Sequence, residues 1–233
     1  AARSAFERAN TIYDELLDTD PGSIQYKIEA GVQFMNYSNI LRSENPQLAA
    51  EFNDRSVALL EEAYTKFPQR TDVESYLFNA HGARASTYDA LSHYCESVVS
   101  WNRAVELAPL DRQITVELLR ALALARCGDN DMATQAANAL FHAKNTSAVD
   151  LYNIACVFGL LHQSSQKTTD SNPTEILDNN YSERAIELLC RDATIDFLQN
   201  PNNLQQLMLD TDLESVRASP SFSKLSKRLS LVD

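Results

Sequence analysis

Histidine and cysteine are the first residues to consider for chemistry, because imidazole and thiolate groups bind metals and act as bases or nucleophiles. The chain contains four of each, and none follows the HExxH or CxxC spacing of a metal site. We therefore expect no metal or cofactor site, with the histidines in packing or surface roles and the cysteines as small buried apolar residues. These residues are His81, His93, His142, His162, Cys95, Cys127, Cys156 and Cys190.

Carboxylate pairs are the other groups that could catalyse a reaction. Glu61 and Glu62 lie in a helical pattern with a mixed surface, whereas Asp129 and Asp131 lie where a helix begins and carboxylates cap free backbone N–H groups. With five glycines, the chain offers no loop that could cradle a phosphate, and it lacks the HRD and DFG motifs of a protein kinase. The sequence predicts no catalytic residue in this segment, which we expect not to be an enzyme.

The charge balance bears on the class of partner. The formal net charge is -12, and the 20 lysines and arginines form no dense run. Nucleic-acid binding needs clustered basic residues, so this composition disfavours it. Solubility explains this acidity, and the alternative is a preference for basic or neutral peptide ligands. No apolar run approaches the roughly 20 residues that cross a bilayer. We predict a cytoplasmic protein with no membrane segment.

The elements that would position a site are paired helices. Residues 114–147 and the stretch from 148 onward repeat one pattern at an offset of 34 residues, which is typical of a helical solenoid. Upstream, three helices each carry a small residue, a large one, another small or apolar one and a terminating proline. The three series are Ala9, Tyr13, Leu16 and Pro21; Ser56, Leu60, Ala63 and Pro68; and Ser97, Trp101, Ala104 and Pro109.

These residues resemble the tetratricopeptide repeat (TPR) family. The resemblance implies an all-α fold, a right-handed α-solenoid of about five antiparallel helix pairs, with a C-terminal helical cap and a surface that holds another protein or a peptide. We expect a repeat domain over residues 1–200, a polar insertion loop over 163–180 and a short helical cap over 201–233. In the cap, the apolar residues Leu207, Leu213, Val216 and Phe222 can cover the exposed face of the last repeat. Because Ala5 to Thr19 follows a second-helix pattern, the first repeat is incomplete, and either further structure precedes it or this helix serves as a cap.

The tail carries a second resemblance. We expect the last repeat helix over about residues 181–198. Its residues Ser182 to Leu189, with Asp210 to Arg217 and Pro220 to Phe222 after it, are similar to the ending of a bacterial TPR group that often follows a Ser/Thr protein kinase domain. The resemblance implies a C-terminal regulatory or docking region of such a kinase. The alternative is a stand-alone TPR module that assembles with other proteins or with copies of itself.

In the resembled family, ligands lie against the first helix of each pair. Applying that frame to this sequence gives mainly apolar and neutral residues, without the basic set that clamps a peptide carboxylate. The alternative is that many of these residues pack between repeats. The candidate groove residues are Ile28, Val32, Met35, Asn79, Ser86, Leu118, Leu122, Tyr152, Asn153 and Cys156.

Overall fold

The computed structural model describes residues 2–143, 146–169 and 180–229 of the 233-residue chain. It divides into two compact units, residues 1–116 and 117–233. Within the described residues the regular structure is helical and no strand occurs, which confirms the all-α prediction. None of the helices in these ranges is both long and apolar enough to cross a membrane.

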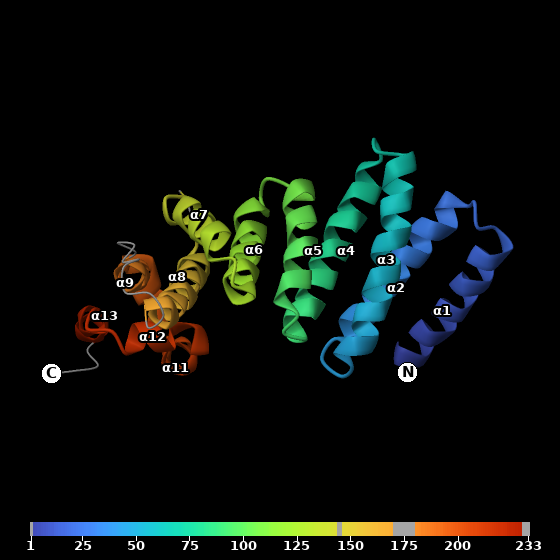
Figure 1. Ribbon diagram of the computed structural model, residues 1–233. Helices are drawn as coiled ribbons and strands as arrows, with labels where there is room; N and C mark the ends of the chain where they lie inside the picture. The colour runs from blue at the N-terminus through green and yellow to red at the C-terminus, as the bar shows by residue number, and fades with distance from the viewer. Residues whose placement is uncertain (1, 144–145, 170–179, 230–233) are drawn as a thin grey trace. The chain divides into compact units, whose positions relative to one another are not determined.

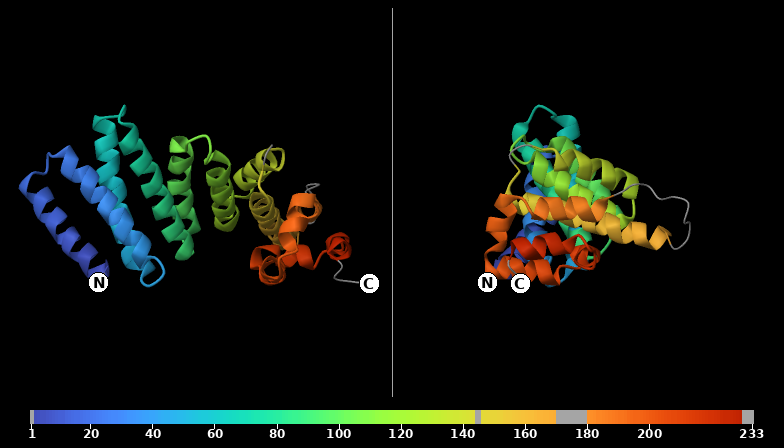
Figure 2. Two further views of the ribbon diagram at one scale, coloured as in Figure 1. Left: turned by 180° about the vertical axis from the view of Figure 1, so that it is seen from behind. Right: turned by 90° about the vertical axis from the view of Figure 1, so that its left-hand side faces the viewer.

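Unit 1 is a row of helices in which each packs against the next (Figures 1 and 2). Short turns join them, so neighbours run antiparallel, as the repeat pattern predicts. The helices are α1 (Ala2–Thr19), α2 (Ile24–Leu41), α3 (Pro46–Lys66), α4 (Thr71–Ala90) and α5 (Tyr94–Leu107), and α6 (Gln113–Cys127) crosses from unit 1 into unit 2.

The prolines end the helices as expected. Helices α1, α3 and α5 each stop shortly before Pro21, Pro68 or Pro109. A proline lacks the N–H that a helix needs and its ring disfavours helical geometry in the residue before it, so the chain turns toward the next helix. The Gly128 turn also follows prediction, with φ of 89°, and Asp129 caps α7 by accepting a hydrogen bond from the Met132 N–H.

Small residues let α2 and α3 approach closely. Ser56 on α3 is fully buried and its hydroxyl donates to the Gly31 carbonyl at 2.7 Å. A Cβ on Gly31 would lie 2.7 Å from Cγ of Leu60, the large residue that fills the adjoining space. The small residue Ser56 followed four positions later by the large residue Leu60 therefore determines how α2 and α3 pack.

A buried chain of hydrogen bonds joins three consecutive helices of unit 1. Asn53 on α3 accepts from the Ser38 hydroxyl of α2 at 2.6 Å and donates to the Thr87 hydroxyl of α4 at 2.9 Å. All three side chains are fully buried. Because unpaired polar groups are costly away from water, these bonds favour one register among α2, α3 and α4.

Unit 2 is organised around α8. Consecutive side chains along its middle are buried, and α9, α10, η1 and α12 all contact it. Figure 2 shows the C-terminal helices gathered beside α8. The elements are α7 (Asn130–Phe141), α8 (Ala148–Thr169), α9 (Tyr181–Leu189), α10 (Asp192–Leu198), α11 (Pro201–Leu209), η1 (Thr211–Leu213), α12 (Glu214–Arg217) and α13 (Phe222–Arg228).

Two sequence-based boundaries need correction. Helix α8 continues through Thr169, into the range predicted as a polar loop over 163–180, because glutamine and lysine are good helix formers and Ser164 accepts a hydrogen bond from Asn130 of α7. Residues 170–179 of that range lie outside the described residues. The helix expected over 181–198 is two helices, since α9 ends at Leu189 and α10 begins at Asp192.

The C-terminal segment packs on α8 at a glycine. The Ser215 hydroxyl donates to the Gly159 carbonyl at 3.0 Å, and a Cβ on Gly159 would clash with the carbonyl oxygen of Asp212. Of the four predicted cap residues, Leu207, Leu213 and Val216 are fully buried, and Phe222 is partly exposed. The cap therefore packs against α8 through both apolar burial and close backbone contact.

Substituting Gly159 with alanine tests this contact. Alanine normally favours a helix over glycine by about 1 kcal/mol, but here a backbone carbonyl must move, so we expect Gly159→Ala to lower the free energy of unfolding by about 1–3 kcal/mol. Gly82→Ala is the matched control, because its Cβ would lie 3.9 Å from Trp101. Urea unfolding followed by circular dichroism measures both. Equal effects of the two substitutions would contradict the close packing of the cap.

Candidate functional site

The candidate groove residues separate into buried and accessible groups. The buried ones are Ile28, Met35, Leu118, Tyr152 and Cys156. Asn79 is exposed, and four are partly exposed, namely Val32, Ser86, Leu122 and Asn153. The buried side chains fit the alternative that such residues pack between helices. A role in binding stays a prediction for the accessible ones, of which Val32, Asn79 and Ser86 lie in unit 1.

Unit 1 has a hollow between α1, α2 and the start of α4, which we call the tyrosine hollow. Its volume is about 270 Å³. It contains two of the candidate residues, Ile28 and Val32. The side chains that define it are Tyr13, Ile28, Glu29, Val32, Arg70 and Tyr76.

The tyrosine hollow carries balanced polar groups above an apolar base. Burial and the nearby Glu29 carboxylate raise the pKa of Tyr13, so its hydroxyl stays protonated and can donate hydrogen bonds. Arg70 and Asp72 form an exposed ion pair with Nη2 and Oδ2 2.5 Å apart. This combination suits a neutral or mixed peptide segment better than a highly charged one.

A second, larger hollow lies between α4 and the turn that follows α5, and we call it the acidic hollow. Its volume is about 510 Å³. It includes Asn79, the exposed candidate residue on α4. The side chains that define it are Glu74, Phe78, Asn79, Glu106, Leu107 and Asp111.

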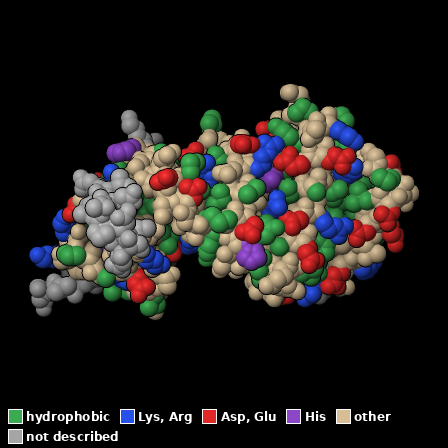
Figure 3. All heavy atoms as spheres, in the orientation of Figure 1, with side chains coloured by type: hydrophobic (Ala, Val, Ile, Leu, Met, Phe, Trp, Pro, Cys, Tyr) green, Lys and Arg blue, Asp and Glu red, His purple; other side chains and the backbone are tan. Residues whose placement is uncertain are grey.

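Helix α4 separates the two hollows and supplies a wall to each. Tyr76 faces the tyrosine hollow and Phe78 the acidic one, and both pack against the core cluster that contains Leu77. They are partly exposed, so each offers an aromatic surface to a ligand. On the face drawn in Figure 3, acidic, basic and apolar side chains lie intermingled over unit 1. The sequence analysis did not include Tyr76 and Phe78 among the candidate groove residues, because it selected only fixed positions of the repeat. Their closeness in sequence to Asn79, which it did select, could have indicated them.

Helix α4 also carries a buried histidine, His81. His81 Nε2 on α4 is 3.0 Å from Glu61 Oε1 on α3, and Arg103 Nε on α5 is 2.9 Å from the same oxygen. His81 is buried, in line with the packing role expected for it, and it has a carboxylate partner that the sequence analysis did not identify. The partner is 20 positions away in sequence, on another helix, so spacing along the chain could not reveal it.

Burial lowers the pKa of His81, and Arg84 and Arg103 add to this effect while Glu61 opposes it. Burial alone would raise the pKa of Glu61, but hydrogen bonds from Arg103 and His81 outweigh it and leave that pKa below its ordinary value. His81 Nδ1 is buried with no acceptor among the described residues. The neutral imidazole is therefore the form that the folded unit favours.

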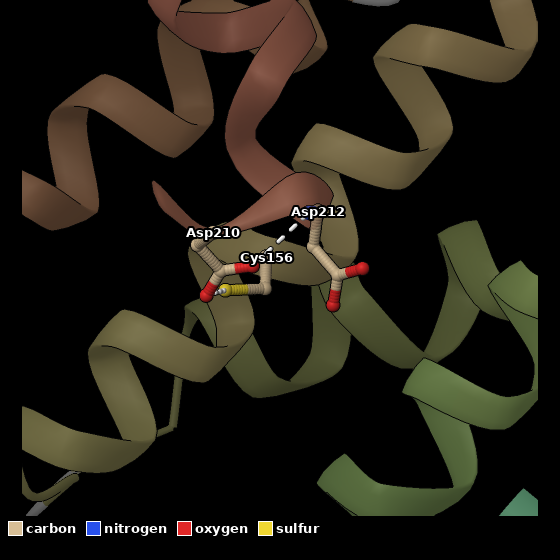
Figure 4. A group of neighbouring side chains, drawn as sticks. All are labelled: Cys156, Asp210 and Asp212. Atoms are coloured by element: carbon tan, nitrogen blue, oxygen red, sulfur yellow. Dashed lines mark hydrogen bonds between the residues drawn. The ribbon is translucent and has the colours of Figure 1, made fainter. Parts of the chain in front are cut away.

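In unit 2, Cys156, Asp210 and Asp212 place one thiol and two carboxylates within 4.8 Å of one another (Figure 4). These residue types can bind metals. Each is already engaged, since Asp210 accepts from the Tyr152 hydroxyl at 2.9 Å and from the Cys156 thiol at 3.7 Å. Asp212 pairs with Arg126 at 2.5 Å. The cluster therefore joins α8 to the start of η1 by hydrogen bonds.

The protonation of this cluster agrees with that role. Burial raises the pKa of Cys156 well above its ordinary value, and the neighbouring carboxylates raise it further. Burial also raises the pKa of Tyr152 and that of Asp212. A neutral thiol and a neutral phenol are hydrogen-bond donors, which is what the Asp210 carboxylate needs at this position.

Comparison with known proteins gives no family assignment. No family model matches the sequence, and no curated protein matches it. Among solved structures, the chain is similar to one described as the crystal structure of the yeast Tom70, with 15% identity and a TM-score of 0.28. The match covers 99% of this chain and 58% of that one. A likeness at this level carries no functional argument.

The buried histidine predicts how stability depends on pH. Because the pKa of His81 is lower in the folded protein than in the unfolded chain, the unfolded chain binds more protons below about pH 6.5, and the free energy of unfolding falls as pH falls. The variant His81→Gln keeps a donor toward Glu61 and does not titrate. We expect it to lose less stability than the parent between pH 7 and about pH 5.5.

Urea unfolding followed by fluorescence measures this change, because Trp101 is the only tryptophan and is buried in unit 1. His93→Gln serves as the control, since His93 is exposed. If the parent and His81→Gln lose the same free energy over this range, the buried neutral histidine is not the cause.

Proposed function

We propose that this chain is a protein-interaction scaffold that docks a peptide segment of a partner protein over α2 and α4 of unit 1. The observation that carries the proposal is the pair of hollows that share α4. Together they offer partly exposed aromatic side chains on a rigid helical frame. Such a surface can bind apolar side chains of a segment at low entropic cost to the scaffold.

The surface favours binding over catalysis. Its side chains are mainly aromatic, amide and carboxylate groups on separate helices, and its walls carry no histidine or cysteine. Val32 and Tyr76 can contact apolar groups, while Asn79 can pair with the main chain of a bound segment. A peptide segment bound in this way would gain affinity from several shallow contacts instead of one deep pocket.

The larger protein is a further part of the proposal. The resemblance of Asp210 to Arg217 and Pro220 to Phe222 to the tails of bacterial kinases supports a cytoplasmic Ser/Thr protein kinase that carries this scaffold at its C-terminal side. The coding sequence upstream of Ala1 tests that attachment. If that sequence contains no kinase domain, the proposed attachment to a kinase is wrong, and the proposed scaffold function is unaffected.

A photoreactive residue placed in the hollow tests docking directly. We expect benzoylphenylalanine at Asn79, which is exposed in the acidic hollow, to cross-link one partner protein in the source cells. Benzoylphenylalanine at Glu51, exposed on α3 and outside both hollows, is the matched control. We expect at least about tenfold less of the same product there, because cross-linking requires direct contact.

The mass of the product separates the alternatives. A product with twice the mass of the chain would show self-association, and light scattering across concentrations would then give its stoichiometry. Equal products from both positions, or none from Asn79, would count against a docking surface at α4.

A further inference from the structure

We infer that the acidic hollow receives a cationic side chain, arginine or lysine, from the docked segment. The inference rests on the proposed function and adds the chemical class of the ligand.

The hollow has an apolar base and a polar rim. Leu107 is 8% exposed at the base, and Phe78 on α4 is partly exposed next to it. The rim includes the exposed residues Asn79 and Asp111. A long basic side chain fits this arrangement, because its methylene groups can lie on the apolar base while its charged end stays near the rim.

The charge on the rim is negative. Three carboxylates line the hollow, from Glu74, Glu106 and Asp111, against one guanidinium, from Arg112. Glu106 is paired with Arg103 at 2.7 Å. Within the part of the chain that the structure describes, Glu74 and Asp111 form no ion pair. These two carboxylates are thus available to an incoming cation.

The backbone adds to the negative electrostatic potential of the hollow. Helix α5 ends at Leu107, and the residues of that end, Glu106 to Ala108, line the hollow. The C-terminus of a helix carries a partial negative charge from its last carbonyl groups, and it attracts cations. The hollow therefore presents negative charge from the Glu74 and Asp111 side chains and from the main chain together.

An aromatic face completes the match to arginine. Phe78 offers a ring edge or face to a guanidinium, which stacks on aromatic rings and forms two hydrogen bonds with a carboxylate. Lysine would gain the charge but not the stacking. We therefore expect arginine to bind more tightly than lysine in this hollow.

Two matched tripeptides test the inference on the full chain. The probe is acetyl-Leu-Arg-Leu-amide, and its control replaces arginine with citrulline, which has nearly the same shape and no charge. We expect saturable amide shift changes in nuclear magnetic resonance spectra at Glu74, Ser75, Asn79 and Leu107. Affinity for the citrulline peptide should be roughly fivefold lower, the size expected for partly exposed charge pairs.

Variants of the chain identify the carboxylates. The double variant Glu74→Gln, Asp111→Asn should reduce affinity for the arginine peptide roughly fivefold and weaken the dependence of that affinity on salt. Glu51→Gln, an exposed carboxylate on α3, should leave the affinity unchanged. Equal affinity for the two peptides, or no effect of the double variant, would overturn the inference.

The same variants separate this inference from the proposed function. If the partner cross-linked at Asn79 still binds the double variant as tightly as the parent chain, the cationic ligand is wrong and the docking surface stands. If the arginine peptide binds as described but no partner contacts Asn79, the hollow binds cations and the scaffold proposal fails.

Discussion

The hydrogen bonds of Asn53 are the constraint on which unit 1 depends. Its amide lies at the centre of three packed helices, accepting from Ser38 on α2 and donating to Thr87 on α4. Apolar contacts between helices tolerate small sliding movements, whereas an amide that bonds in two directions does not. The alternative registers would bury polar groups without partners, at a cost comparable to much of the stability of a small domain.

The two hollows depend on the position of α4, because residues of α4 line both of them. Two contacts fix α4 against α3, namely the hydrogen bond between Thr87 and Asn53 and the contact of His81 with Glu61. The Arg103 guanidinium extends the second contact to α5, whose end borders the acidic hollow. A shallow surface built in this way is preorganised, so a ligand does not have to order it.

Much of the fold could be predicted because it depends on the spacing of small, large and proline residues within each helix. Ser56 and Leu60, or Ser97 and Trp101, lie four positions apart on one helix face, and a proline after each helix marks where it ends. These rules need only the helical period and the steric properties of each residue. They specified the helix pairs and the capping role of Leu207, Leu213 and Val216 without reference to distant contacts.

The site was harder to predict, because burial depends on neighbours that the period does not identify. Tyr152 and Cys156 occupy positions that face a ligand in the resembled family, yet here they are buried and bond to Asp210, more than 50 positions later. The sequence analysis did not select Phe78 and Glu74 as groove residues. Both line a hollow that forms only because the end of α5 lies beside them, and the helical period does not specify that neighbour. Polar residues with helix propensity likewise extended α8 into a predicted loop.

The free energy of unfolding of an Asn53→Ala variant, followed by Trp101 fluorescence in urea, tests the central constraint most directly. The account predicts a loss of about 2–4 kcal/mol, because the substitution removes buried hydrogen bonds and leaves a cavity between three helices. Asn39→Ala, at an exposed position of α2, should change the value by less than about 0.5 kcal/mol. An equally small change in Asn53→Ala would contradict the claim that this amide holds the helices in register.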